Sequence, residues 1–174
     1  PGAVFWSASP RWGTDEMYTV SFSVLAATQP TWTGETVLAR CVRPPQEEAP
    51  SNQFQPSTDT VTDTETLLIW QKDVAVIEAT FAEAQTYCAD LTLDGVATWR
   101  VPSLKELQTL VDDEKTPEFL HAEQTAFPAL GDSSSFWTST VDEAIVGRAW
   151  MVDFREGFTS TNNDFALLAV RCVR

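Results

Sequence analysis

The side chains that could carry chemistry in this chain are few, and their spacing forms no catalytic motif. The only histidine is His121, and no cysteine or second histidine stands near it at metal-ligand spacing. A lone histidine in a loop is more often a solvated side chain than a general base. The sequence also lacks a glycine-rich phosphate loop, a nucleophile elbow and an HExxH helix. We therefore expect no enzymatic activity.

Two groups of oxygen-bearing side chains are the candidates for a metal site. They are Asp112, Asp113 and Glu114, and Asn162, Asn163 and Asp164. Hard oxygen donors of this kind suit Ca²⁺. Solvated loop acids and an asparagine-rich turn explain the same residues without a metal. Calcium is therefore the minor hypothesis, and no other cofactor is expected.

Aromatic side chains outside the predicted core are the other ligand-binding candidates. Trp12 and Trp32 are expected in loops of the first 43 residues, and Phe158 in a turn after Glu156-Gly157. Such rings can stack on sugar faces or anchor a protein interface. They can equally cover an apolar sheet, and the sequence leaves both roles open.

The charge of the chain restricts its partners. The net charge is −14, and all of it falls after residue 43. Such a surface repels phosphate backbones and sulfated glycans, whose binding needs clustered lysine and arginine. No apolar run approaches the length of a membrane span. We expect neither nucleic acid nor a membrane span.

Two short helices and several strands are predicted to position these residues. Thr80 with Glu83, and Ser103 with Glu106, have the spacing of capping boxes, and apolar side chains follow each at helical spacing. Arg100 is expected to pair with a carboxylate near the second helix start. The predicted elements are a strand or hairpin over 59–71, helices over 80–91 and 103–111, a long loop over 112–134, and strands over 135–139, 148–154 and 166–173.

Five motifs occur in an order that resembles a known family. They are Thr66-Leu67-Leu68-Ile69-Trp70-Gln71-Lys72, Phe81-x-x-Ala84-x-x-Tyr87-Cys88, Trp99-Arg100-Val101-Pro102-x-x-x-Glu106-Leu107, Phe136-Trp137-Thr138-Ser139-Thr140 and Arg171-Cys172-Val173-Arg174. Over about residues 58–174 the chain resembles the C-terminal domain family of the Legionella collagen-like adhesin. The resemblance implies an α+β, C-type-lectin-like fold with two short helices and a mostly antiparallel twisted sheet. It also implies a secreted or surface-displayed bacterial protein, often a binding module.

The resemblance further implies a disulfide between Cys88 and Cys172. Such a bond fits an oxidising compartment, and therefore an extracellular or cell-surface location. Cys41 is then left without a partner in the chain. Three reduced, buried thiols are the alternative.

The two ends of the chain also resemble each other, over segments of 39 residues each. The matching pairs are Phe5-Trp6-Ser7-Ala8-Ser9 with Phe136-Trp137-Thr138-Ser139-Thr140, Tyr18-Thr19-Val20-Ser21-Phe22 with Trp150-Met151-Val152-Asp153-Phe154, and Ala39-Arg40-Cys41-Val42-Arg43 with Val170-Arg171-Cys172-Val173-Arg174. Residues 1–43 are predicted to be the C-terminal half of a preceding copy, an extra β segment. A proline-rich linker over 44–57, with Phe54 as its one candidate anchor, then leads to a complete domain over 58–174.

This repeat leaves two arrangements open. Either another chain supplies the missing helical half, or residues 1–43 dock onto the second copy, and Cys41 would pair with the absent helix cysteine. We expect the chain, which begins at Pro1, to be a fragment of a tandem-domain protein. Two functions follow as hypotheses. In one, loops 112–134 and 155–165 bind a glycan or protein ligand. In the other, the protein is a structural subunit of a surface filament, in which residues 1–43 complete a neighbouring domain.

Overall fold

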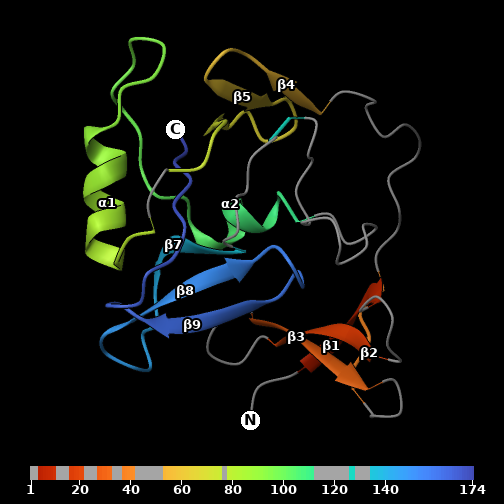
Figure 1. Ribbon diagram of the computed structural model, residues 1–174. Helices are drawn as coiled ribbons and strands as arrows, with labels where there is room; N and C mark the ends of the chain where they lie inside the picture. Colours follow the sequence, from red (N-terminus) through yellow and green to blue (C-terminus); the bar gives the residue numbers. More distant parts are fainter. Residues whose placement is uncertain are drawn as a thin grey trace.

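The computed structural model describes residues 4–10, 16–21, 27–32, 37–41, 53–75, 78–111, 126–127 and 134–174. Within these ranges the chain forms three antiparallel three-stranded sheets and two helices (Figure 1). In chain order the elements are β1 (Val4–Pro10), β2 (Glu16–Ser21), β3 (Ala27–Trp32), β4 (Phe54–Pro56), β5 (Thr60–Asp63), β6 (Ile69–Gln71), α1 (Phe81–Asp90), α2 (Leu104–Gln108), β7 (Ser135–Val141), β8 (Arg148–Asp153) and β9 (Thr159–Asn163).

This architecture confirms the predicted α+β class, with two short helices and antiparallel sheets. The sheets are β1-β2-β3, β4-β5-β6 and β7-β8-β9, each a meander of consecutive strands. The C-type-lectin-like assignment stays a prediction.

Both helices begin at the predicted capping boxes. The Thr80 side chain accepts from the Glu83 N–H, and the Glu83 carboxylate accepts from the Thr80 N–H. Ser103 and Glu106 make the same reciprocal bonds at the start of α2. Helix α2 ends at Gln108, earlier than predicted, because the next N–H groups bond three residues back and tighten the last turn.

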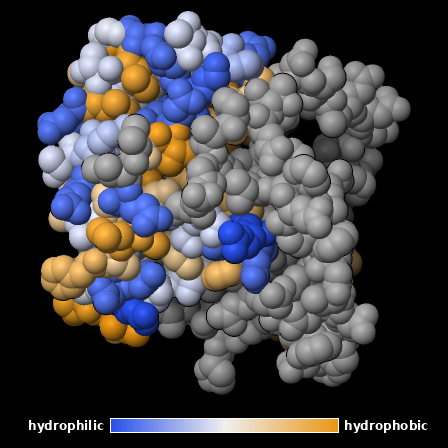
Figure 2. All heavy atoms as spheres, viewed as in Figure 1, coloured by the Kyte–Doolittle hydropathy of each residue, from blue (hydrophilic) through white to orange (hydrophobic). Residues whose placement is uncertain are grey.

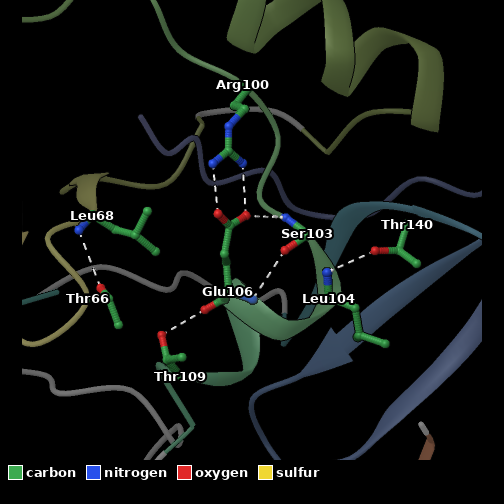
Figure 3. A network of polar contacts seen from close by, with 8 residues as sticks. All are labelled: Thr66, Leu68, Arg100, Ser103, Leu104, Glu106, Thr109 and Thr140. Carbon is green, nitrogen blue, oxygen red and sulfur yellow. Dashed lines mark hydrogen bonds and ion pairs between the residues drawn. The ribbon is translucent and has the colours of Figure 1, made fainter. Parts of the chain in front are cut away.

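The Glu106 carboxylate also pairs with Arg100, as Figure 3 shows. The two guanidinium nitrogens of Arg100 donate to its two oxygens, at 2.8 and 2.7 Å. This contact confirms the expected carboxylate partner of Arg100. The hydrogen bonds from Arg100, followed by those from Ser103, lower the pKa of Glu106 to about 2. The pair therefore fastens the segment before α2 to the helix itself.

The third strand of the C-terminal meander lies elsewhere than predicted. It is β9, within the range assigned to a binding loop, whereas residues 166–173 form no regular strand. This closing segment (residues 166–174) instead makes single bridges to several partners. They are Ala79 with Leu168, Phe136 with Ala169, and Trp70 and Arg100 with Val173. The prediction of a strand over 166–173 was wrong because an apolar, β-branched composition suits any extended, buried segment, paired or not.

The end of the predicted linker belongs to the folded domain. Strand β4 pairs with β5, and the ring of Phe54 lies 5.5 Å from the ring of Phe127 in an edge-to-face contact. Phe54 is therefore the anchor that the sequence suggested, but the linker assignment over 44–57 is wrong for residues 54–56. Residues 44–52 lie outside the described part of the chain.

The sheet of β7, β8 and β9 separates two hydrophobic clusters. Phe136, Trp150 and Val152 belong to one cluster, while their neighbours Trp137 and Met151 belong to the other. Alternate residues of a strand point to opposite faces, so the buried residues of strands β7 and β8 face a hydrophobic cluster on each side of the sheet. The closing segment alternates in the same way, with Ala169 and Val173 in the first cluster and Val170 and Cys172 in the second.

A disulfide and a buried arginine hold the closing segment in place. Cys172 is bonded to Cys88 of α1, with Cα atoms 5.5 Å apart, which confirms the predicted pairing. Closing a loop between residues 84 positions apart contributes about 4 kcal/mol in the chain-entropy account. Arg171 is 1% exposed, and its Nη1 donates to the carbonyls of Gln71 and Lys72, both at 2.8 Å. Burial lowers the pKa of Arg171 to about 9, so the guanidinium remains charged at neutral pH.

The same hairpin turn occurs in two of the sheets. It follows Asp63 and Asp153, and each carboxylate accepts from the N–H groups two and three residues ahead. The fifth residue of each turn has a positive φ, 62° at Leu67 and 69° at Gly157. Glycine adopts that conformation at no steric cost, whereas leucine does not.

The N-terminal meander has the same register as the C-terminal one. The equivalent pairs are Phe5–Val20 and Phe136–Val152, Trp6–Thr19 and Trp137–Met151, Pro10–Met17 and Val141–Ala149, and Tyr18–Pro30 and Trp150–Thr161. The register shift between Trp6 and Pro10 recurs between Trp137 and Val141. This agreement supports the repeat hypothesis. Trp32, predicted to lie in a loop, is instead the last residue of β3.

We predict that Glu106→Gln destabilises the domain in a pH-dependent way. A carboxylate whose folded pKa is lowered stabilises the fold above its unfolded value, near 4.5, and the stabilisation is lost as the pH falls towards 2. At pH 7 the substitution should lower the free energy of unfolding by about 1 kcal/mol, a modest value because the pair is partly exposed. Urea unfolding at pH 7 and pH 3 measures the difference between the two proteins, which should shrink at pH 3. Glu83→Gln is the matched control, because Glu83 has the same capping position and no arginine partner. A difference in the free energy of unfolding between Glu106→Gln and the unaltered protein that does not change with pH would contradict the assignment.

The paired turns predict opposite effects of two glycine substitutions. Leu67→Gly should raise the free energy of unfolding by about 0.5–1 kcal/mol, because Leu67 is 77% exposed and loses little burial when its positive φ is relieved. Gly157→Ala should lower it by about 1 kcal/mol, because alanine is strained at that φ. Thermal unfolding of the two variants checks the signs, and two shifts in the same direction would refute the shared geometry.

Candidate functional site

The C-terminal domain exposes large apolar side chains on two neighbouring loops. Val146 is fully exposed and Phe165 is 82% exposed. We define the apolar loop patch by the five large apolar residues of this region that are at least half exposed, namely Val141, Ile145, Val146, Phe165 and Leu167. Figure 2 shows hydrophobic residues gathered at the lower left of the view, where Figure 1 places the loop between β7 and β8 and the end of β9. Single exposed apolar residues are ordinary, but a contiguous group marks an interaction surface.

Hydrogen bonds fix the loop between β7 and β8. The Asp142 N–H donates to the Arg148 carbonyl at 2.9 Å, and the Asp142 carboxylate accepts from the Ala144 N–H. Gly147 closes the loop with a φ of +79°, a conformation that side chains rarely adopt. These bonds hold Ile145 and Val146 at the tip of the hairpin.

The turn after β9 is fixed by its own polar side chains and by this loop. The Asn163 side chain accepts from the Phe165 N–H at 2.8 Å, an Asx turn that places Phe165 outside the sheet. The Asp164 N–H donates to the Gly147 carbonyl at 3.0 Å, and the Asp164 carbonyl accepts from the Phe81 N–H at the start of α1. The loop, the turn and the first residue of α1 are therefore joined by backbone hydrogen bonds.

Three of the predicted ligand-binding residues lie next to this patch. Asn162 and Asn163 are the last two residues of β9, rather than loop residues, and Asp164 follows them. The Asn162 side chain accepts from the Asn163 N–H, so both asparagines serve the turn itself. Oδ1 of Asp164 is buried and has no hydrogen-bond partner among the described residues.

The other predicted site residues lie elsewhere or are not described. Phe158 is half-buried against the cluster that contains Cys88 and Trp137. Trp32 is the last residue of β3, a strand that contacts β9, and Trp12 lies outside the described residues. Of the three predicted aromatic residues, the structure therefore describes the side-chain surroundings of Phe158 alone, and these belong to the core.

The calcium hypothesis gains no ligand set from the structure. Asp112, Asp113 and Glu114 lie outside the described residues. Within the ranges that are described, no group of three or more histidine, cysteine, aspartate or glutamate side chains could hold a metal ion. Cys41 is exposed, and it is the free cysteine of the described part.

Acidic residues stand next to the apolar loop patch in the sequence. Asp142 and Glu143 begin the β7–β8 loop, Asp164 precedes Phe165, and Arg148 is the one basic residue within residues 141–148 and 162–167. An apolar centre with a charged rim is the usual composition of a protein interface. The acidic rim favours partners with basic groups and disfavours anionic ones.

Sequence reasoning missed this patch because its residues sit inside predicted structure. Phe165 and Leu167 were assigned to a loop end and a buried strand, and Ile145 and Val146 lie in a short turn between strands. A signal was available in the repeat, because the residues at the positions of Val141, Phe165 and Leu167 are Pro10, Gly34 and Thr36. The fold therefore does not require apolar residues at these places.

A comparison with known protein families matches residues 59–174 to the Lcl C-terminal domain. The chain belongs to the Lcl C-terminal domain family. The match covers more than half of the chain and includes the disulfide, both helices and the apolar loop patch. Membership indicates a module related to bacterial surface adhesins. Among curated proteins, no match to the sequence was found.

Family membership and the disulfide both point to an extracellular location. In the described part of the chain, no helix has the length and apolar character needed to cross a membrane.

Proposed function

We propose that this Lcl C-terminal domain protein is a non-catalytic, extracellular bacterial adhesion module that binds a protein ligand through the apolar loop patch. The observation that carries the proposal is the exposure of five large apolar side chains on and beside two loops that a backbone hydrogen bond joins to each other. Fixed loops lose little conformational entropy on binding, so more of the contact energy appears as affinity.

Burial of this patch supplies enough free energy for a specific contact. Removing one large apolar side chain from water contributes about 1.5–3 kcal/mol. A few such residues, with Phe165 as the aromatic anchor, are sufficient for the central part of an interface. The acidic rim then selects a partner that carries lysine or arginine near an apolar surface.

A protein ligand fits this surface better than a sulfated glycan does. The net charge of −14 and the acidic residues beside the patch repel sulfate groups. Neutral sugars need aromatic faces and polar side chains that are free to bind hydroxyl groups. The two asparagines next to the patch already accept hydrogen bonds from the backbone of their own turn. The glycan alternative is therefore the less supported of the two.

The second candidate function is that of a structural subunit of a surface filament, in which residues 1–43 complete a neighbouring domain. The observation in its favour is the common register of the N-terminal and C-terminal meanders. The two functions are compatible, because they use different parts of the chain.

We predict that substitutions in the apolar loop patch abolish protein binding without unfolding the domain. Val146→Asp combined with Phe165→Ser should weaken binding to arrayed extracellular proteins at least tenfold, because the anchor is removed and an acid is added at the tip. Thermal unfolding should be nearly unchanged, because both side chains are exposed.

Leu67→Ser is the matched control, since Leu67 is 77% exposed but lies on the turn between β5 and β6. It should leave binding unchanged. A glycan array that includes heparan sulfate is probed in parallel. Binding confined to glycans, or protein binding that the double variant retains, would refute the proposal.

A further inference from the structure

A carboxylate lies where the two loops of the apolar loop patch meet. The Asp164 N–H donates to the Gly147 carbonyl at 3.0 Å, so Asp164 is held beside the tip of the β7–β8 loop and directly precedes Phe165. Its side chain lies over the glycine, because a Cβ atom placed on Gly147 would be 3.8 and 4.0 Å from the two carboxylate oxygens. The charge therefore lies within the patch, one residue from Phe165 and one hydrogen bond from the neighbour of Val146.

The structure supplies no cation for this carboxylate. Its Oδ1 is buried without a hydrogen-bond partner, and no ion pair of Asp164 occurs in the ranges that the structure describes. Asp164 as a whole is partly exposed, so a molecule in solution can approach it. A carboxylate oxygen that loses water without gaining a donor costs free energy. A donor brought by a binding partner would offset that cost.

The turn after β9 does not need this carboxylate. Other turns of the domain use an aspartate oxygen to accept backbone N–H groups, namely those at Asp63, Asp142 and Asp153. After β9 that role belongs to Asn163, whose side chain accepts from the Phe165 N–H. The repeat agrees, because the residue of the N-terminal segment at the position of Asp164 is Thr33. An acid at position 164 is therefore not a requirement of the turn itself.

We propose that Asp164 is the specificity-determining residue of the apolar loop patch and receives a lysine or arginine side chain of the protein partner. This inference rests on the proposed function and names the group that the patch selects. The aliphatic part of such a side chain covers apolar surface while its charged end reaches the carboxylate. Val146 and Phe165 supply that surface, and the ring of Phe165 also attracts the cation.

A metal ion fits this position less well than a basic side chain does. Ca²⁺ takes about six to eight oxygen ligands. The side-chain oxygens of Asn162 and Asn163 are engaged with backbone N–H groups, and the Gly147 carbonyl accepts from the Asp164 N–H. A lysine or arginine requires only the carboxylate, because its own side chain brings the donors.

The test uses the full chain and, as probe, an array of extracellular proteins in three forms. One form is untreated, one has its lysines acetylated, and one has its arginines blocked by a dicarbonyl reagent. Proteins that bind in the untreated form should lose at least tenfold in affinity after one of the two treatments, because the cation that meets Asp164 is then neutral or blocked.

Asp164→Asn removes the charge and keeps the shape of the side chain. It should weaken binding to the untreated array at least tenfold, and its residual binding should no longer respond to either treatment, because the two groups then cease to be coupled. Thermal unfolding should be nearly unchanged, since the turn does not use the carboxylate. Glu143→Gln is the matched control. It removes one negative charge from an exposed residue of the β7–β8 loop and should change binding less than threefold.

Equal losses with Asp164→Asn and Glu143→Gln would assign the effect to net charge and overturn the proposal. Binding that a metal chelator abolishes would overturn it as well, because a metal ion would then take the place of the basic side chain. If Val146→Asp with Phe165→Ser abolishes binding while Asp164→Asn retains it, this inference fails and the proposed function stands. If both variants bind like the unaltered protein, the proposed function fails too.

Discussion

The folded domain depends on the closing segment, which passes between two hydrophobic clusters and is fixed there by a cystine and a buried cation. Alternate residues of this segment enter opposite clusters, so it cannot shift by one residue without exchanging its entire apolar set. Cys172 ties it to α1, and Arg171 ties it to the end of β6. Burial of a guanidinium is costly, and here two carbonyl acceptors and the ring of Phe127, 4.5 Å away, offset that cost. The part of the domain that contains both helices (residues 53–111) is therefore joined to the β7-β8-β9 meander through the closing segment.

Because the closing segment makes these contacts, the domain consists of two complementary parts. Residues 53–111 contribute the β4-β5-β6 sheet and both helices, and residues 134–174 contribute the meander and the closing segment. The disulfide between these parts joins residues that are far apart in the sequence, since Cys88 and Cys172 are 84 residues apart.

The apolar loop patch has the physical character of a reversible contact surface. It lies on and beside two short loops, which are joined by the backbone hydrogen bond from the Asp164 N–H to the Gly147 carbonyl. Such a surface is suited to contact with a partner of matching shape and charge.

The sequence alone determined the features that depend on neighbouring residues or on matched motifs. The capping boxes at Thr80 and Ser103 follow from local spacing, whereas the α+β class with antiparallel strands and the Cys88–Cys172 bond followed from family resemblance. Only the tertiary structure decided the features that depend on long-range pairing. It placed β9 where a loop was expected, left residues 166–173 without a regular partner, and exposed Phe165 and Val146 on one surface. The physical reason is that an apolar extended residue has the same local preference whether a sheet, a core or solvent receives it, and contacts between distant segments determine which of these it meets.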